Sequence, residues 1–437
     1  MMKKNIYTLL ALAAISVGLV SCRKTEAEIL TPSNQLDYRL PSEQFLSIWN
    51  SMNTSYAMWD LEDVDWTSVK NEYLPEFLAL DDSVKADYTI STSHLNELYT
   101  GILGGLTDHH ACFSIKNLWA NDADMQRFDI SPGNIEISSR DYYHKEHIHS
   151  KYINWALKYP SYGDVLGIHS WDDLTMVAWL KKLEAQGRAR DVKYGSVEDV
   201  VTVVSGLVDG CIPYIHISDF SLTELLELAQ DSYASQDVED TFAAYESFKK
   251  NVLELDEVKG VIIDLRENGG GYLNDEFYLL GLLIDKPVQM GWSREKSGLG
   301  RFDYSPWIPH IFYPGPEHRA VEGPVVVVSD LYSVSMSEIT TMLVKALPNG
   351  CFIGERTFGG HGVITGDFES DYAGTFGEPG ANHFGYLSSR IVKDYNGDIL
   401  EGIGVFPDIE MRFTEDSFKG GEDTWLTRAV EYIHNGI

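Results

Sequence analysis

Cysteine is scarce in this chain, because Cys22 is followed only by Cys112, Cys211 and Cys351. The last three are widely spaced and form no CxxC pair, which argues against a zinc knuckle. Their odd number leaves at least one of them without an internal disulfide partner. Each lies in an apolar stretch of sequence, so we interpret them as small buried residues.

Basic residues are also few, with 34 Lys and Arg against 66 Asp and Glu and a formal net charge of −32. Nucleic-acid binding requires a basic footprint, so this balance excludes a nucleic-acid partner. The excess of acidic residues favours solubility outside the cell. The glycine turn at 359–362 precedes no helix with Lys-Ser/Thr, so it does not indicate a phosphate loop, and the sequence predicts no cofactor.

Long hydrophobic runs are absent beyond residue 20, so no later segment is a candidate for a membrane-spanning helix. The apolar stretch 6–20 follows two lysines, a layout typical of a secretory signal. It ends at Cys22 in a run that resembles a bacterial lipobox, which implies cleavage before this cysteine and its acylation. We therefore expect a signal peptide at 1–21, a lipidated tether at 22–40 and membrane attachment through the lipid. The expected location is the bacterial cell envelope, on its periplasmic or outer-membrane face.

The rest of the chain divides by its apolar periodicity. Residues 41–111 carry apolar side chains at helical spacing, which predicts an α-helical N-terminal domain. Residues 112–205 mix short strand-like runs with one helix. From 206 to 437 apolar strands alternate with helices, and this pattern predicts an α/β core with a mainly parallel sheet and crossover helices. Functional side chains are expected at the carboxyl ends of those strands.

The most informative segment is a serine-rich turn between a buried strand at 324–328 and a helix at 337–347. A serine in such a turn is exposed at the sheet's edge, beside the free backbone donors of the helix, and those donors can stabilise an oxyanion. Serines before a helix also serve as N-caps, and Ser335 or Ser337 could do so here. The residues alone leave both interpretations open.

Five segments in this region resemble, in order, the motifs of the tail-specific (C-terminal-processing) serine protease family. They are YIHIS at 214–218, GVIIDLRENGGG at 260–271, SVSMSE at 333–338, GERTFG at 354–359 and EGIGVFPDI at 401–409. The resemblance implies a ClpP/crotonase-like serine protease core at 206–437. It makes Ser335 the nucleophile and places the oxyanion hole at the amides of Gly270 or Gly271 and of Met336. A PDZ module often precedes this core, but 112–205 shows no carboxylate-binding glycine loop, so we expect at most a degenerate one.

The base that activates the serine is less clear from the motifs. Many family members place a lysine where this chain has Gly360, followed by His361. A second branch, which includes the tricorn core protease, uses an N-terminal histidine, and LGGLTDHHA at 103–111 is similar to its L-x-D-x-H pattern. This likeness implies His110 as the base, with Glu401 orienting it through a relay and His361 as the alternative base. A purely structural alternative is a histidine pair that interacts with a helix C-terminus.

Two weaker groups of residues complete the candidates. Cys112 lies near the histidine pair and could in principle act as a nucleophile. His144, His147 and His149 match no zinc-protease spacing, so the sequence predicts no metal. The resulting prediction is a serine-type endopeptidase acting on peptide or protein substrates through a Ser335 acyl-enzyme. The alternative is an inactive family member that binds a peptide or an apolar ligand as a lipoprotein.

Overall fold

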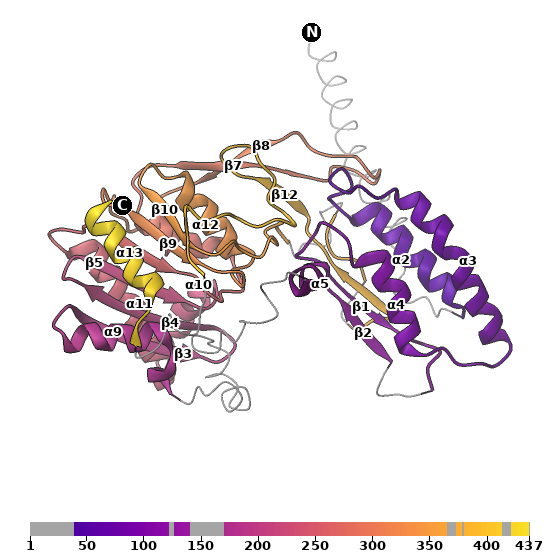
Figure 1. Ribbon diagram of the computed structural model, residues 1–437, viewed down its shortest axis with the longest axis horizontal. Helices are drawn as coiled ribbons and strands as arrows, with labels where there is room; N and C mark the ends of the chain where they lie inside the picture. Colours follow the sequence, from indigo (N-terminus) through magenta and orange to yellow (C-terminus); the bar gives the residue numbers. More distant parts are fainter. Residues whose placement is uncertain are drawn as a thin grey trace, which may run out of the picture.

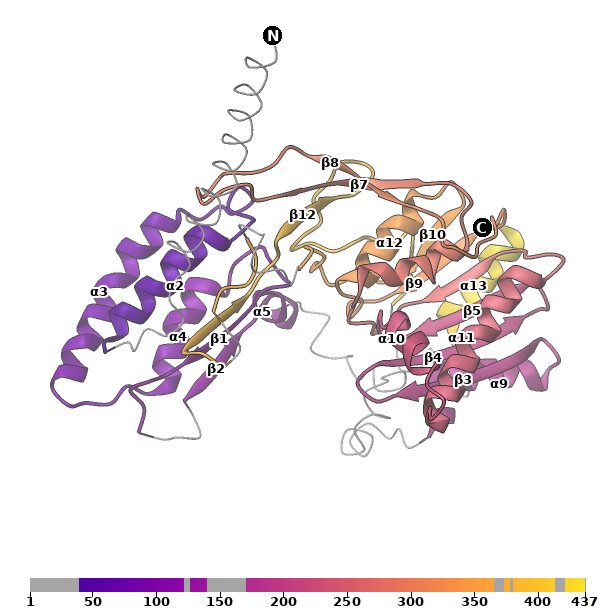
Figure 2. The same cartoon turned by 180° about the vertical axis from the view of Figure 1, so that it is seen from behind.

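The computed structural model describes residues 39–121, 126–139, 170–364, 373–377, 380–412 and 421–436. Cys22 and the histidines at 144, 147 and 149 lie outside these residues, as do the expected signal peptide and most of the tether. The N-terminal helices and the large sheet lie at opposite ends of the molecule, and strands β7, β8 and β12 run between them (Figures 1 and 2). Within the described residues, no helix is both long and apolar enough to cross a membrane.

The N-terminal unit contains three helices, α2 (Pro41–Ser55), α3 (Trp66–Lys85) and α4 (Thr92–Leu103). Side-chain caps define the starts of the second and third, since Asp65 accepts a hydrogen bond from the Thr67 amide and Ser91 accepts one from the His94 amide. Aromatic side chains fill the space between the helices, including a stacked Phe45–Phe77 pair with ring centroids 4.5 Å apart.

A three-stranded sheet completes this unit, in the order β11 (His383–Tyr386), β1 (Cys112–Lys116), β2 (Arg127–Ile130). Its central strand follows the histidine pair directly and is antiparallel to both neighbours. The short helix α5 (Pro132–Ser139) comes next. Residues 41–111 thus contain the three helices, and the sheet that packs against them comes from residues 112–130 and from the distant strand β11.

The core is a seven-stranded sheet in the order β13-β10-β9-β6-β5-β4-β3. Neighbouring strands from β5 to β13 are parallel, and the hairpin strands β3 and β4 are antiparallel at one edge. The strands, in chain order, are β3 (Ala189–Val197), β4 (Val201–Val208), β5 (Ile212–Ile217), β6 (Val261–Asp264), β9 (Val325–Ser329), β10 (Gly350–Gly354) and β13 (Ile409–Glu410). The predicted α/β fold with a mainly parallel sheet is confirmed.

Helices cover both faces of this sheet, which explains why its central strands are apolar throughout. One face packs against α10 (Leu222–Leu228), α11 (Gln236–Glu254) and α12 (Met336–Ala346). The other packs against α9 (Thr175–Ala185) and α13 (Thr424–Asn435). Short 3₁₀ helices lie at η3 (Trp171–Asp173), η4 (Leu273–Phe277) and η5 (Leu280–Leu282).

A third sheet, β12-β7-β8, connects the two ends of the molecule. Its strands are β7 (Val288–Glu295), β8 (Ile308–Phe312) and β12 (Arg390–Lys393). Two arginines attach β7 and the β7–β8 connection to the N-terminal unit. Arg294 of β7 forms an ion pair with Asp60 in the turn after α2, and the Nε atom of Arg301 in the connection donates to Asn53 Oδ1 of α2 at 2.9 Å.

The stretch 112–205 does not form a unit of its own. Strands β1 and β2 belong to the N-terminal sheet, whereas β3 and β4 belong to the core sheet. Strand β4 crosses the expected boundary at residue 205 and is buried along its whole length, because helices cover it on both sides. The described strands at the two ends of the predicted middle region therefore pair with the flanking units, and the boundary at residue 205 falls inside β4.

Candidate active site

The serine-rich turn links the end of β9 to the start of α12, and Ser335 occupies the N-cap position of that helix. Its backbone has φ 58° and ψ −117°, a conformation that is strained for a residue with a side chain. The Ser335 side chain nevertheless makes no capping hydrogen bond. The N-cap interpretation therefore does not explain this serine, and its hydroxyl group is available for another role.

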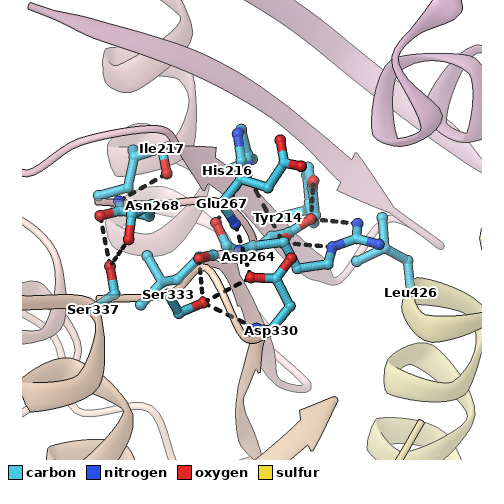
Figure 3. Close-up of polar contacts among 12 residues, drawn as sticks. Tyr214, His216, Ile217, Asp264, Glu267, Asn268, Asp330, Ser333, Ser337 and Leu426 are labelled. Carbon is cyan, nitrogen blue, oxygen red and sulfur yellow. Dashed lines mark hydrogen bonds and ion pairs between the residues drawn. The ribbon is translucent and has the colours of Figure 1, made fainter. Parts of the chain in front are cut away.

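Hydrogen bonds from the neighbouring serines fix this turn (Figure 3). Ser333 Oγ donates to the Leu265 carbonyl at 2.7 Å and accepts from the Asp330 amide at 2.9 Å. Ser337 Oγ lies 2.8 Å from the carbonyl oxygen of Asn268 and 2.5 Å from its side-chain Oδ1. The two outer serines of the motif thus connect the turn to the loop that follows β6, and the middle serine is left between them.

The glycine loop after Asn268 lies directly against the serine. Gly270 has φ 99°, and a Cβ atom on it would be 2.5 Å from Ser335 Cβ and 3.0 Å from the Met336 amide nitrogen. The Gly270 amide donates to Asn268 Oδ1 at 2.8 Å. This contact engages the Gly270 N–H, so of the two predicted glycine donors the structure favours Gly271 over Gly270. Gly271, with φ 135°, and Met336 remain the candidate donors.

We predict that Gly270→Ala lowers kcat by about 100-fold or more, because the added methyl group has to displace Ser335 or the oxyanion loop. The measurement is steady-state peptide hydrolysis, with circular dichroism to verify folding. Gly210→Ala is the matched control, since Gly210 also has a positive φ, of 73°, but a Cβ there meets no atom within 4 Å. Equal losses in both variants would contradict the steric argument.

His110 lies in the turn between α4 and β1 and is half-buried. Its Nδ1 atom is 2.7 Å from the Gly362 carbonyl oxygen. Because a carbonyl only accepts, Nδ1 carries the proton and Nε2 keeps its lone pair. Burial lowers the pKa of His110, so the ring is neutral at pH 7 and suited to accept a proton.

A single loop, 359–362, holds the serine and the histidine. The Gly360 carbonyl accepts the Ser335 amide at 3.0 Å, and the Gly362 carbonyl contacts the His110 ring. A Cβ atom on Gly360 would lie 3.3 Å from the His110 amide nitrogen, so the histidine turn packs directly on the loop. Among the described contacts there is no direct hydrogen bond between Ser335 Oγ and the His110 ring.

Glu401 is buried beneath the same loop. Its Oε1 accepts the His109 amide at 3.2 Å, and its Oε2 accepts the amides of His361 at 3.0 Å and Gly362 at 2.7 Å. Burial, with added repulsion from other carboxylates, raises the pKa of Glu401. The carboxyl group bonds to no ring atom of His110 in the described structure, and it is linked to this histidine through the backbones of His109 and Gly362.

His361, the alternative base, is almost fully buried, with 2% of its surface exposed. Its Nδ1 is 3.7 Å from Glu401 Oε2, and neither ring nitrogen has a hydrogen-bond partner among the described residues. Burial, with His110 and His109 nearby, lowers the pKa of His361 to about 3. The ring is thus neutral, but no observed contact connects it to Ser335.

Two buried carboxyl groups support the site and were not among the predicted site residues. Glu338 accepts the Gly359 and Gly360 amides, each at 2.7 Å. Asp108 accepts the His110 amide at 3.2 Å and the Ser388 amide and hydroxyl, each at 2.8 Å. Burial raises the pKa of Asp108 to about 6 and that of Glu338 to about 7. Both carboxyl groups lie within the quoted motifs, whereas Ser388 carries no sequence signal.

Cys112 lies within β1, in register with Tyr386 of β11, and not at a helix N-terminus or next to the serine turn. Its position gives no support to a role as nucleophile. In the portion of the chain that is described, His, Cys, Asp and Glu side chains form no group of three or more that could hold a metal ion.

Comparison with known proteins finds a family that matches much of the core. Residues 212–411 match peptidase family S41. The chain is 25% identical to the tricorn protease of Thermoplasma volcanium over 247 residues. This match covers 56% of this chain and 19% of that protein. Over 183 residues it is 29% identical to the tail-specific protease of Haemophilus influenzae, covering 41% of this chain and 24% of that protein. The chain thus matches a quarter or less of the length of these relatives.

Two solved structures resemble the overall fold. A protein from Parabacteroides merdae has a TM-score of 0.57 at 19% identity, covering 90% of this chain and 96% of that one. Mature CPAF has a TM-score of 0.52 at 13% identity, covering 90% of this chain and 98% of that one. At these identities the likeness concerns the fold alone, and it includes the N-terminal unit as well as the core.

Proposed function

We propose that this chain, whose residues 212–411 match peptidase family S41, is a serine peptidase that forms an acyl-enzyme on Ser335. The observation that carries the proposal is the conformation of this serine. It is held at a strained φ of 58° at the start of α12, its side chain caps nothing, and the Gly270 backbone lies against it. An unstrained N-cap residue could begin the helix without this backbone conformation. Strain that is kept at a single residue is typical of a functional position.

The proposed reaction uses the observed neighbours of the serine. Ser335 Oγ attacks the substrate carbonyl carbon, while His110 Nε2 takes the hydroxyl proton. The carbonyl oxygen becomes an oxyanion beside the amides of Gly271 and Met336. When the C–N bond breaks, His110 returns the proton to the leaving amine. Water then attacks the acyl-enzyme with the same base, releasing the acid and restoring Ser335.

The contacts of His110 support it over His361 as the base. The Gly362 carbonyl fixes the His110 tautomer with Nε2 unprotonated, and the Asp108 carboxyl group fixes its backbone. Glu401 secures the loop that provides this carbonyl, so we assign it an indirect orienting role. His361 has no comparable contacts that would orient its ring.

Peptide and protein substrates follow from the proposed chemistry, and an extended substrate would bind through main-chain hydrogen bonds. Endopeptidase action and preference for chain tails extend the proposal, in keeping with the name of the Haemophilus influenzae relative. Attachment to the cell envelope through an acylated Cys22 is proposed from the sequence around that residue.

The second candidate is a binding protein without catalysis. It is favoured by the absence of the family's lysine at Gly360 and by the lack of a direct Ser335–His110 hydrogen bond in the described structure. In that case the strained serine turn would only shape a peptide or apolar-ligand site.

A fluorophosphonate probe separates these two functions. The signal-less wild type should be labelled, and mass spectrometry should find the adduct on the peptide that contains Ser335. Heat-denatured protein is the control, because an unactivated serine hydroxyl is a weak nucleophile. If folded wild type is not labelled and does not cleave a peptide library, the binding function replaces the peptidase.

A further inference from the structure

A buried carboxyl group connects the glycine loop to the helix that begins after Ser335. Glu276 lies on η4, which follows the glycine loop directly, and 1% of its surface is exposed. Its Oε1 atom is hydrogen-bonded to the hydroxyl of Thr340 on α12. The same hydroxyl is 2.8 Å from the Met336 carbonyl oxygen. Through Thr340, Glu276 therefore connects η4 to Met336, the first residue of α12. The proposed oxyanion hole lies between these two segments, because Gly271 precedes η4 and Met336 supplies the other amide.

The number of hydrogens available around Thr340 favours a protonated Glu276. A threonine hydroxyl has one hydrogen, and the Met336 carbonyl can only accept it. When Thr340 donates to that carbonyl, its contact with Glu276 requires a hydrogen from the carboxyl group. A protonated Glu276 gives each contact its own hydrogen, whereas an ionised Glu276 has to share the single hydroxyl hydrogen with the Met336 carbonyl. The other carboxyl oxygen, Oε2, is buried without a partner, which is less costly for a neutral acid than for an anion.

The other side of η4 is fixed by the adjacent residue. The Asp275 carboxyl group accepts the Thr223 amide at 3.0 Å and also the Leu222 amide and the Thr223 hydroxyl, so it caps the start of α10. The 3₁₀ turn is therefore connected to α10 through one acid and to α12 through the next. Breaking the contact between Glu276 and Thr340 would therefore allow the glycine loop to move relative to Ser335.

We propose that Glu276 is a positioning residue that works in its protonated form, aligning the glycine loop with the Met336 amide and limiting activity at alkaline pH. This inference rests on the proposed peptidase function. Glu276 does not touch the substrate; it acts through Thr340 and the backbone that the two segments share. The ionisable group beside it on η4 is Asp275, and the group facing it from α12 is the neutral hydroxyl of Thr340.

Titration of this group has a defined direction. Burial, with a smaller effect from Asp275, raises the pKa of Glu276 from 4.5 to about 7. An acid whose pKa is raised by folding stabilises the folded state most fully below pH 4.5, and this stabilisation is lost as the pH rises through 7. Loss of its proton should therefore weaken both the fold and the alignment of the site above neutral pH.

The test is the pH profile of kcat/KM. In wild type we expect a bell shape, with an acid limb from His110 and an alkaline limb that falls by about tenfold per pH unit once Glu276 has ionised. E276Q should keep the acid limb and lose the alkaline limb, because an amide donates to Thr340 at every pH. T340V should lower kcat by about tenfold and also remove the alkaline limb. The double variant should be no worse than T340V alone.

Thr341 provides the matched control. It is also a buried threonine of α12, with its hydroxyl bonded to the Ser337 carbonyl and to Ser329, and T341V should keep the alkaline limb. An alkaline limb that persists unchanged in E276Q would overturn the proposal. Thermal unfolding across pH 5 to 9 tests the same proton independently of activity: E276Q should lose less stability than wild type as the pH rises from 5 through 7. If wild type does not cleave peptides but E276Q still loses less stability than wild type, the proposed peptidase function is contradicted and the proposal of a protonated, structural Glu276 is retained.

Discussion

Replacement of Ser335 by alanine is expected to lower peptide hydrolysis by about a millionfold, the order observed when the nucleophile of a serine protease is removed. The backbone donors near the glycine loop would remain, so hydrolysis should stay above the rate in water by a factor of about a thousand or more. The measurement is kcat/KM with a fluorogenic peptide, together with fluorophosphonate labelling, which should disappear. Residual activity above a few per cent would mean that another group is the nucleophile.

The Ser335→Gly variant separates chemistry from fold. At φ 58° and ψ −117°, glycine relieves strain that alanine retains. Both variants should be inactive, but S335G should be about 1 kcal/mol more stable than S335A in urea unfolding. Such a result would show that the native turn holds its serine at a cost in stability, as functional sites often do. Equal stabilities would mean that the turn relaxes around the side chain and is not strained in solution.

The predictable part of this site is the part that is local in sequence. The strand, turn and helix around Ser335 follow from a run of valines, a serine-rich segment and an amphipathic helix, all within about twenty-five residues. The close approach of Gly270 follows from a run of three glycines after a buried strand. Local patterns of this kind depend on backbone conformation and burial, which a few neighbouring residues determine.

The parts that sequence reasoning missed depend on individual hydrogen bonds and strand pairings that no pattern in the sequence specifies. The Gly270 amide could not be recognised as occupied without seeing the Asn268 side chain fold back on it. Ser388, which binds Asp108 over a separation of 280 residues, lies in a segment without any motif. The boundary near residue 205 was misplaced because β4 pairs within the core sheet, and pairing partners are set by topology and not by local pattern.

The identity of the base is where sequence and geometry combine. His110 and His361 were both candidates by motif, and only their hydrogen bonds distinguish them. One ring is oriented by the Gly362 carbonyl with a free nitrogen lone pair, while the other is buried without a hydrogen-bond partner in the described structure. A base has to be held in one orientation while the proton moves, so the oriented ring is the effective one.

His110→Ala is therefore expected to lower kcat by about 10⁴-fold or more and to abolish fluorophosphonate labelling, whereas His361→Ala should stay within about tenfold of wild type. Both variants remove an imidazole side chain, one from the turn between α4 and β1 and the other from the loop 359–362 that packs against that turn, so His361→Ala is the matched control for loss of packing. The acid limb of the pH profile should disappear in the residual activity of His110→Ala and persist in His361→Ala, because burial lowers the pKa of His110 without removing its titration. The reverse outcome, with His361→Ala inactive and His110→Ala active, would transfer the base to His361 and make Gly362 a structural contact only.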